Sequence, residues 1–535
     1  MLSIHINKVA RLSRFLTLLV VCAGLVLGGL WLFEPTKQTV NLGSSSSISD
    51  TSSSSDPKIL RLGVVSLPPA LGNPYRGTGV PTIYTYRAMF EGLTFVTEDG
   101  DVKPRLATSW ERIDDLTWKF NLRRDVLFHN GVPFTADAVV FAVQYLTSDE
   151  ARVEPIARDL GAIERAEATD EHTVLIHTRV AAPLLPALTE ALMIVEPGQW
   201  RRLGREGFAV EPVGTGPFKL TEWGEAKATL DAHKDGWRPP KVDGLLILAL
   251  PDTSSRVQAM LSDRLDIAVA MSRDNILAVE SGGGRGDVGK TTSTLGISFI
   301  LTKTAENHPI QDKRVRQALN YAVNKDAYIE ALFGGLTKAA SQPSTASGFG
   351  YNPAVKPYPY DPDRARALLA EAGYPDGFSF TAQVTIGGGA SLAPAYQQVA
   401  ADLLNVGVVM TLRTMPVQQL IRGIQEGEWR GEAFGMNYSV ERTTDSLRPA
   451  RLHSCIQRNP WYCNEDLTEK INQAFATSDL DDRRQRTEEI MAIYHDDAAA
   501  IWMHEVIVFK ALGPRVKNFR QDLTVLNYDE IELLP

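Results

Sequence analysis

The chain contains few cysteines, and it has fewer basic than acidic residues. Its 535 residues include three cysteines, and 55 Lys and Arg stand against 64 Asp and Glu, a formal net charge of −9. Three thiols in so long a chain cannot form a disulfide scaffold. An acidic protein repels phosphate backbones, so nucleic acid is not expected as a partner. The length exceeds what one hydrophobic core supports, and two or more lobes are expected.

Motifs of catalysis and of phosphate binding are also missing. The chain contains no G-x-S-x-G and no H-E-x-x-H, and His504-Glu505 has no second histidine at metalloprotease spacing. The glycine-rich stretch 282–286 lacks the Lys-Ser/Thr ending of a phosphate-binding loop, which favours a surface loop. We therefore expect neither catalytic residues nor a bound cofactor.

The N-terminal residues indicate export. Lys8, Arg11 and Arg14 precede an unbroken apolar run at 15–33. A helix needs about 20 such residues to cross the hydrocarbon of a bilayer. Basic residues before the run place 1–14 in the cytoplasm and everything downstream outside. The run is expected to be a signal anchor, with a cleaved signal peptide as the alternative.

A tether is expected to follow the apolar run. Cys22 comes after Val21 rather than after a small residue, which argues against a lipidated cysteine. Residues 34–57 include LGSSSSISDTSSSSDP, a composition that buries too little apolar surface to fold and predicts a flexible linker. The body of the protein is therefore expected in the periplasm, tethered to the inner membrane by the helix.

Strand and helix patterns alternate along the rest of the chain, which predicts an α/β fold. Strands are expected at 58–66, 118–122, 173–177, 245–250, 266–270, 297–302, 378–384, 408–414 and 506–509. Helices are expected at 82–91, 135–146, 254–261, 313–323, 361–372, 395–404, 467–476 and 483–497. Thr135 and Asp361 are expected as N-caps, and Pro362 stands at a first helical position.

Cys455 and Cys463 are close enough in sequence to close a small loop. Together with His453 they could instead supply three zinc ligands, but no fourth ligand stands at a suitable spacing. An exported compartment favours oxidation. We therefore expect a disulfide between the two cysteines and no metal site.

Several segments, taken in order, resemble one known family. They are FEGL at 90–93, VKPRLATSW at 102–110, LTWKFNLRRDVLFHNGVPFTADAVVFA at 116–142, GTGPFKL at 214–220, DKRVRQALNYAVNKDA at 312–327 and DPDRARALLAEAGYPDG at 361–377. In this order and at these spacings, the chain resembles the extracellular solute-binding proteins of ABC importers, family 5 (cluster C), of the dipeptide- and oligopeptide-binding type. The resemblance covers nearly the whole chain after the linker.

The resemblance implies a two-lobed periplasmic binding protein (type II, cluster C). It places lobe I at 58–292 and 508–535, with an extra subdomain at about 75–205, and lobe II at 293–507. With these bounds the chain passes between the lobes twice, at 292–293 and at 507–508. These two crossings would form a hinge, and the solute would be enclosed as the lobes close. The expected partners are a small-molecule or peptide solute and the permease and ATPase of an ABC importer.

The resemblance also points to residues that could contact the solute. Peptide-binding members often fix the ligand's α-amine with a carboxylate three residues after an aromatic. The matching position is Glu441, where Asp is usual, and it would form a charge-assisted pair with an ammonium. The glycines at 214 and 216 predict a sharp turn with exposed amides. The full set of candidates is Asn73, Tyr75, Gly214, Thr215, Gly216, Pro217, Tyr438, Glu441 and Asp445.

The class of ligand stays open at this point. Glu441 in place of Asp weakens the case for an amine site, and Arg442 and Arg448 suit an acidic solute instead. The same fold could bind an opine, a sugar or a nickel chelate, because fold does not specify ligand. An anchored extracytoplasmic hydrolase is a further alternative, although no sequence feature supports it.

Overall fold

Ten strands form the main sheet of the computed structural model, which describes residues 56–77, 79–385, 392–440, 444–523 and 525–535. In sheet order they are β14 (Val409–Met415), β13 (Ser379–Thr385), β15 (Ala433–Ser439), β12 (Arg285–Phe299), β16 (Ala500–Leu512), β11 (Ile267–Met271), β1 (Ile59–Val64), β10 (Gly244–Ala249), β9 (Lys227–Ala232) and β8 (Phe218–Trp223). Parallel pairs such as β1 with β10 and β13 with β14 stand beside antiparallel ones. The expected α/β class is confirmed.

Smaller sheets and fifteen helices complete the described chain. One sheet has four strands, in the order β4 (Ala107–Asp114), β5 (Thr117–Leu122), β7 (Thr173–Thr178) and β6 (Ile163–Asp170). Three further sheets have two strands each: β2 (Thr94–Val96) with β3 (Val102–Pro104), β17 (Val516–Lys517) with β20 (Glu532–Leu533), and β18 (Gln521–Asp522) with β19 (Val525–Leu526). The helices are α2 (Val80–Met89), α3 (Ala136–Leu146), α4 (Pro155–Asp159), α5 (Leu185–Leu188), α6 (Pro197–Val210), α7 (Thr253–Leu261), α8 (Arg273–Ser281), α9 (Lys313–Tyr321), α10 (Lys325–Phe333), α11 (Pro362–Glu371), α12 (Leu392–Leu404), α13 (Val417–Glu426), α14 (Leu447–Leu452), α15 (Glu465–Ala476) and α16 (Leu480–Asp496).

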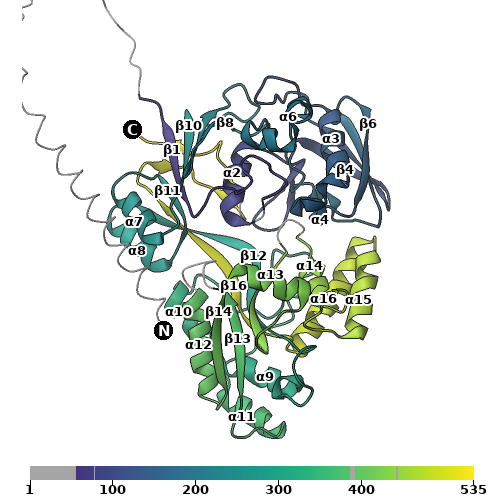
Figure 1. Cartoon of the computed structure of the whole chain (residues 1–535), viewed down its shortest axis with the longest axis vertical. Helices are drawn as coiled ribbons and strands as arrows, with labels where there is room; N and C mark the ends of the chain where they lie inside the picture. Colours follow the sequence, from purple (N-terminus) through teal and green to yellow (C-terminus); the bar gives the residue numbers. More distant parts are fainter. Residues whose placement is uncertain (1–55, 78, 386–391, 441–443, 524) are drawn as a thin grey trace, which may run out of the picture. The chain divides into compact units, whose positions relative to one another are not determined.

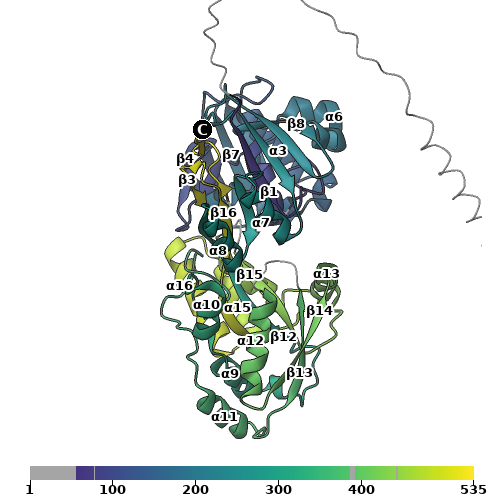
Figure 2. The ribbon, with the colours of Figure 1, turned by 90° about the vertical axis from the view of Figure 1, so that its left-hand side faces the viewer.

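The hydrophobic interior divides into two cores. The first core gathers buried residues between 60 and 269 together with the chain end from 512 to 533. The second core, in two adjoining clusters, gathers residues between 257 and 511. β11 belongs to both, because its side chains alternate: Ile267 faces the first core and Ala268 the second. Helix α12 packs on β14 at the far edge of the main sheet (Figures 1 and 2).

Strands β12 and β16 run from one core to the other (Figure 1). They pair antiparallel from Arg285 opposite Leu512 to Ser298 opposite Ala500. The register shifts between Lys290 and Thr294 and again between Leu295 and Gly296, so the regular ladder of hydrogen bonds is interrupted there. The two long strands therefore share the fewest regular hydrogen bonds where the chain passes from one core to the other.

Local sequence signals account for several element boundaries. The Asp361 carboxylate accepts a hydrogen bond of 2.8 Å from the Arg364 amide, as expected for the N-cap of α11, with Pro362 at its first position. Thr135 stands at the N-cap of α3, but its side chain makes no capping bond. The expected strand at 297–302 is the end of β12, which starts at Arg285. Of the glycine-rich stretch 282–286, expected as a surface loop, residues 282–284 form a short turn after α8 and residues 285–286 already belong to β12.

The expected membrane anchor belongs to the part of the chain before residue 56. No helix in the described part of the chain is long and apolar enough to cross a bilayer. The apolar run at 15–33, and the linker as far as residue 55, lie outside the described residues.

Candidate ligand-binding site

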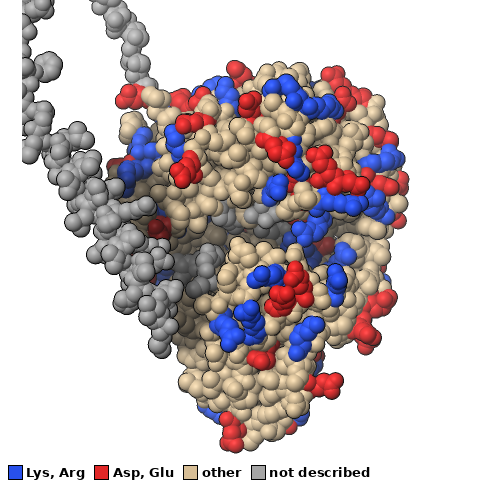
Figure 3. Space-filling view, in the orientation of Figure 1, with Lys and Arg blue, Asp and Glu red and all other residues tan. Residues whose placement is uncertain are grey.

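A cavity of about 1160 Å³ lies where segments packed on the first core meet segments packed on the second. The first core supplies residues 155–162 around α4 and residues 179–188 after β7. The second core supplies the end of α13, residues of α14, and the segment 456–459. In Figure 3 the surface is hollowed between the upper and lower parts of the view, and basic side chains stand along the groove. Residues far apart in sequence thus share one cavity.

A buried ion pair supports the floor of the cavity on the side of the second core. The Arg483 guanidinium donates to the Asp445 carboxylate at 2.7 Å, and the two side chains are 3% and 10% exposed. Arg483 also donates to the carbonyl oxygen of Phe475, near the end of α15, at 2.8 Å. The pair fixes the start of α16 against the end of α15 and against the loop that enters α14.

A second ion pair joins the two sides of the cavity. Arg448, on α14, donates to the carbonyl oxygen of Ser439 at 2.7 Å. Its other terminal nitrogen lies 3.8 Å from the carboxylate of Asp159, at the end of α4. The sequence had indicated Arg448 as a possible partner of an acidic solute, and the structure places it on the cavity wall.

Of the nine candidate residues, Asp445 is the one that lines this cavity among those described. Tyr75 is fully buried and donates its hydroxyl to the carbonyl oxygen of Met193 at 2.9 Å. Asn73 is also buried, and its carboxamide accepts from the Tyr75 amide and donates to Glu154 at 3.4 Å. Through these contacts the stretch that contains Asn73 and Tyr75 packs into the first core.

The turn from Gly214 to Pro217 is buried rather than exposed, which corrects the expectation of free amides. A Cβ at Gly214 would come within 2.1 Å of the Met89 carbonyl oxygen, so only glycine fits against the end of α2. The hydroxyl of Thr215 donates to the carboxylate of Glu91 at 2.9 Å. The GTGPF motif therefore packs on the FEGL motif, which explains why both occur together.

Tyr438 lies in the interior of the second core. It is fully buried, its ring stands 5.0 Å from the ring of Trp502, and its hydroxyl shares a hydrogen bond with Ser298. Burial raises the pKa of this hydroxyl. Glu441 lies outside the described residues. Contact of these candidates with a ligand stays a prediction.

The expected disulfide between Cys455 and Cys463 is confirmed. His453 is buried and uses its Nε2 elsewhere, because this nitrogen accepts from the indole N–H of Trp461 at 2.7 Å, and burial lowers the pKa of the imidazole to about 3. The zinc alternative therefore fails, since both sulfurs are bonded to each other. The closed loop holds residues 456–459 in the cavity wall, and closure of a loop this short stabilises a fold by about 2–3 kcal/mol.

Sequence reasoning missed most of the cavity's basic residues. Arg158 and Arg179 come from the first core, and Arg451 and Arg458 from the second. One signal was present, because Arg448 and Arg451 stand three positions apart and face the same side of a helix. No pattern in the sequence indicates that Arg179 and Arg451 lie near each other. The fold alone brings them to the same cavity.

Comparison with known proteins gives a consistent result. The family model "Bacterial extracellular solute-binding proteins, family 5 Middle" matches residues 101–451. The chain is 28% identical over 461 residues to heme-binding protein A of Haemophilus influenzae, covering 79% of this chain and 82% of that protein. It is 27% identical over 497 residues to the dipeptide-binding protein of Escherichia coli, covering 84% and 88%.

Solved structures agree on the fold. The substrate-binding protein CtaP of Listeria monocytogenes matches with a TM-score of 0.79 at 21% identity, covering 90% of this chain and all of that one. DppA of Helicobacter pylori, in complex with the peptide STSA, matches with a TM-score of 0.72 at 21% identity, covering 89% and 98%. NikZ of Campylobacter jejuni, in complex with Ni(L-His), matches with a TM-score of 0.74 at 19% identity, covering 89% and 99%. The two-lobed periplasmic binding protein fold expected from the sequence is confirmed.

Proposed function

Because this chain belongs to the bacterial extracellular solute-binding proteins of family 5, we propose that it captures a peptide or peptide-like solute for an ABC importer. The cavity lined from both cores carries the proposal, because a solute held there would contact both lobes at once. Relatives named for dipeptides and for di- and tripeptides support the peptide class. The permease and ATPase of the importer are the proposed partners, and the role contains no catalytic step.

Capture requires the lobes to move as the solute enters. We place the lobes at 58–292 with 508–535 and at 293–507, and the hinge in β12 and β16, whose register shifts between Lys290 and Thr294. Bending costs least where ladder hydrogen bonds are already interrupted. The solute then shifts the equilibrium towards the closed state. The size of the shift is set by the difference between its binding free energies to the closed and the open state.

Binding of peptides to the purified protein tests the proposal directly. Calorimetry with di- to hexapeptides should give dissociation constants in the micromolar range or tighter, about −8 kcal/mol or below. Mass spectrometry of what co-purifies with the protein should find peptides. A co-purified sugar, opine or nickel chelate, together with no binding of any peptide, would show that the same fold serves another solute.

The proposed location is the periplasm, with the N-terminal helix as a tether. The basic residues before 15–33 and the Ser-rich stretch after it support an uncleaved anchor. The protein should then stay with the membrane fraction, and a single proteolytic cut in the Ser-rich stretch should release the body into the aqueous fraction. N-terminal sequencing that starts beyond residue 33 would instead identify a cleaved signal peptide.

A further inference from the structure

The cavity is basic although the protein is acidic. Among the described residues that line it there are six arginines and two aspartates, and no lysine, glutamate or histidine. The whole chain has a formal net charge of −9. A cleft of one sign with low-dielectric walls concentrates ions of the opposite sign. The local excess of positive charge does not follow from the charge of the whole protein. It therefore indicates the charge of the solute.

The two acids of the cavity already have arginine partners. Asp445 pairs with Arg483 at 2.7 Å, and Asp159 lies 3.8 Å from Arg448. Four arginines are left over: Arg158, Arg179, Arg451 and Arg458. Within the described parts of the chain, none of the four has a carboxylate within 4.0 Å. Counted over the described residues, the cavity thus holds more cationic groups than its acids neutralise.

Arg451 is the most constrained of the four. Its guanidinium carbon lies 4.2 Å from the centre of the Phe475 ring, a cation–π contact that holds the group against the ring. The side chain is partly buried, and burial lowers its pKa. Within the described residues its guanidinium has no hydrogen-bond acceptor. A partly desolvated cation without an acceptor favours an anionic partner.

We propose that the solute is an anion with at least two carboxylates, an acidic peptide or a similar polycarboxylate, and that Arg179 and Arg451 bind these carboxylates. This rests on the proposed function, because it takes the cavity as the solute site. All the cationic groups are arginines, whose planar fork binds a carboxylate through two parallel hydrogen bonds. Arg179 comes from the first core and Arg451 from the second, so one dianion would join the two lobes.

Calorimetry on the full chain with matched probes tests the inference. Glu-Glu should bind at least tenfold more tightly than Ala-Ala, and Lys-Lys should bind more weakly than both. The advantage of Glu-Glu should shrink as salt is added, because screening weakens interactions between partly exposed charges. Citrate, which has no peptide bond, distinguishes a peptide from another polycarboxylate.

Two variants and one control locate the effect. Arg451→Gln and Arg179→Gln should each remove most of the preference for Glu-Glu over Ala-Ala. Arg179 is exposed, so its variant is expected to fold even if the variant at Arg451 does not. Arg364→Gln removes an equal charge from the half-exposed surface of α11 and should leave the preference unchanged.

The outcomes separate the two proposals. Equal affinity for Glu-Glu, Ala-Ala and Lys-Lys would overturn the anionic class and leave peptide capture standing. Binding of citrate without binding of any peptide would support the anionic class and overturn peptide capture. A preference for Glu-Glu that survives in both arginine variants, or binding of none of the probes, would overturn the inference.

Discussion

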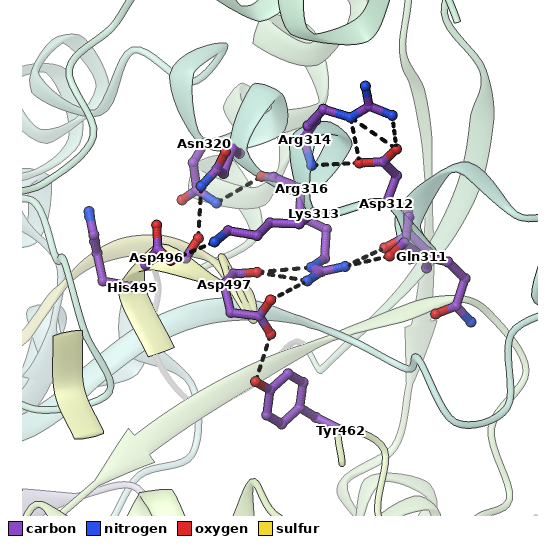
Figure 4. Close-up of polar contacts among 12 residues, drawn as sticks. Gln311, Asp312, Lys313, Arg314, Arg316, Asn320, Tyr462, His495, Asp496 and Asp497 are labelled. Carbon is purple, nitrogen blue, oxygen red and sulfur yellow. Dashed lines mark hydrogen bonds and ion pairs between the residues drawn. The ribbon is translucent and has the colours of Figure 1, made fainter. Parts of the chain in front are cut away.

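Replacing Arg316 by methionine should lower the free energy of unfolding by about 3–5 kcal/mol. Arg316 lies on α9 with its side chain 4% exposed. Its guanidinium donates to the Asp497 carboxylate at 2.7 Å and to the Asp497 carbonyl oxygen at 2.9 Å (Figure 4). It also donates to the carbonyl oxygen of Gln311 at 2.9 Å. Methionine preserves the volume and leaves every one of these acceptors without its donor.

The loss is large because Asp497 would remain as a poorly compensated charge. Its carboxylate would keep one donor in the network, the hydroxyl of Tyr462 at 2.6 Å. Asp497 is the C-cap of α16 and precedes β16, so the network ties α9 to the strand that links the two cores.

Arg314→Met is the matched control for this prediction. Arg314 lies two positions earlier on the same helix and pairs with Asp312, but its side chain is 49% exposed (Figure 4). An exposed pair contributes about 0–1 kcal/mol. Chemical denaturation of both variants measures the difference, and equal losses for the two would contradict the role assigned to burial.

Replacing Lys325 by methionine should raise the free energy of unfolding at pH 7 by about 2–4 kcal/mol. Lys325, at the start of α10, is 3% exposed, and its ammonium has no hydrogen-bond partner among the described residues. Burial lowers its pKa from 10.5 to about 7. The ring of Tyr358, 5.7 Å away, compensates part of the lost hydration, so the gain is smaller than the full pKa difference implies.

The effect should depend on pH in a direction that can be worked out. Above pH 10.5 the lysine is neutral in both the folded and the unfolded chain, and it carries no penalty. As the pH falls towards 7 the unfolded chain takes up the proton first, so the folded state loses stability relative to it. The difference between wild type and Lys325→Met should therefore be largest at and below pH 7 and small at pH 10.

Denaturant unfolding of both proteins at pH 7 and at pH 10 measures this difference. Lys313→Met serves as control, because that side chain is 44% exposed and should show little dependence on pH. A destabilised Lys325→Met at pH 7 would show that the amine has a stabilising partner.

The sequence predicted the elements with clear end signals and missed many others, among them helices α6, α8, α10 and α13, for reasons visible in particular residues. The helix at 361–372 has an N-cap, a proline at its first position and a glycine after its end, and the structure agrees closely. β12 was largely missed because both its edges are paired within the sheet and its sequence, RGDVGKTTSTLGISF, shows no simple alternation of apolar and polar residues. β4 was missed because most of its residues are exposed and polar.

The site was harder to predict than the fold. Motifs that resemble the family most strongly, such as GTGPF and the stretch around Arg316, make internal contacts that hold the fold together. The cavity instead combines residues 155–188 with residues 424–483, two stretches with no sequence relation to each other. Asp445 and Arg448 could be identified from the sequence because they lie next to the segment around Glu441, to which the family resemblance points.

The path of the chain also sets the order in which the protein can fold. β16 stands between β11 and β12 in the main sheet, and residues 512–533 complete the first core, where Tyr528 donates its hydroxyl to the carbonyl oxygen of Tyr84. During synthesis from the N-terminus, the first core therefore stays open until residues 512–533 have been made. The lobe built on the first core therefore stays incomplete while most of the chain is being made, which suits the export before folding that the proposed periplasmic location requires.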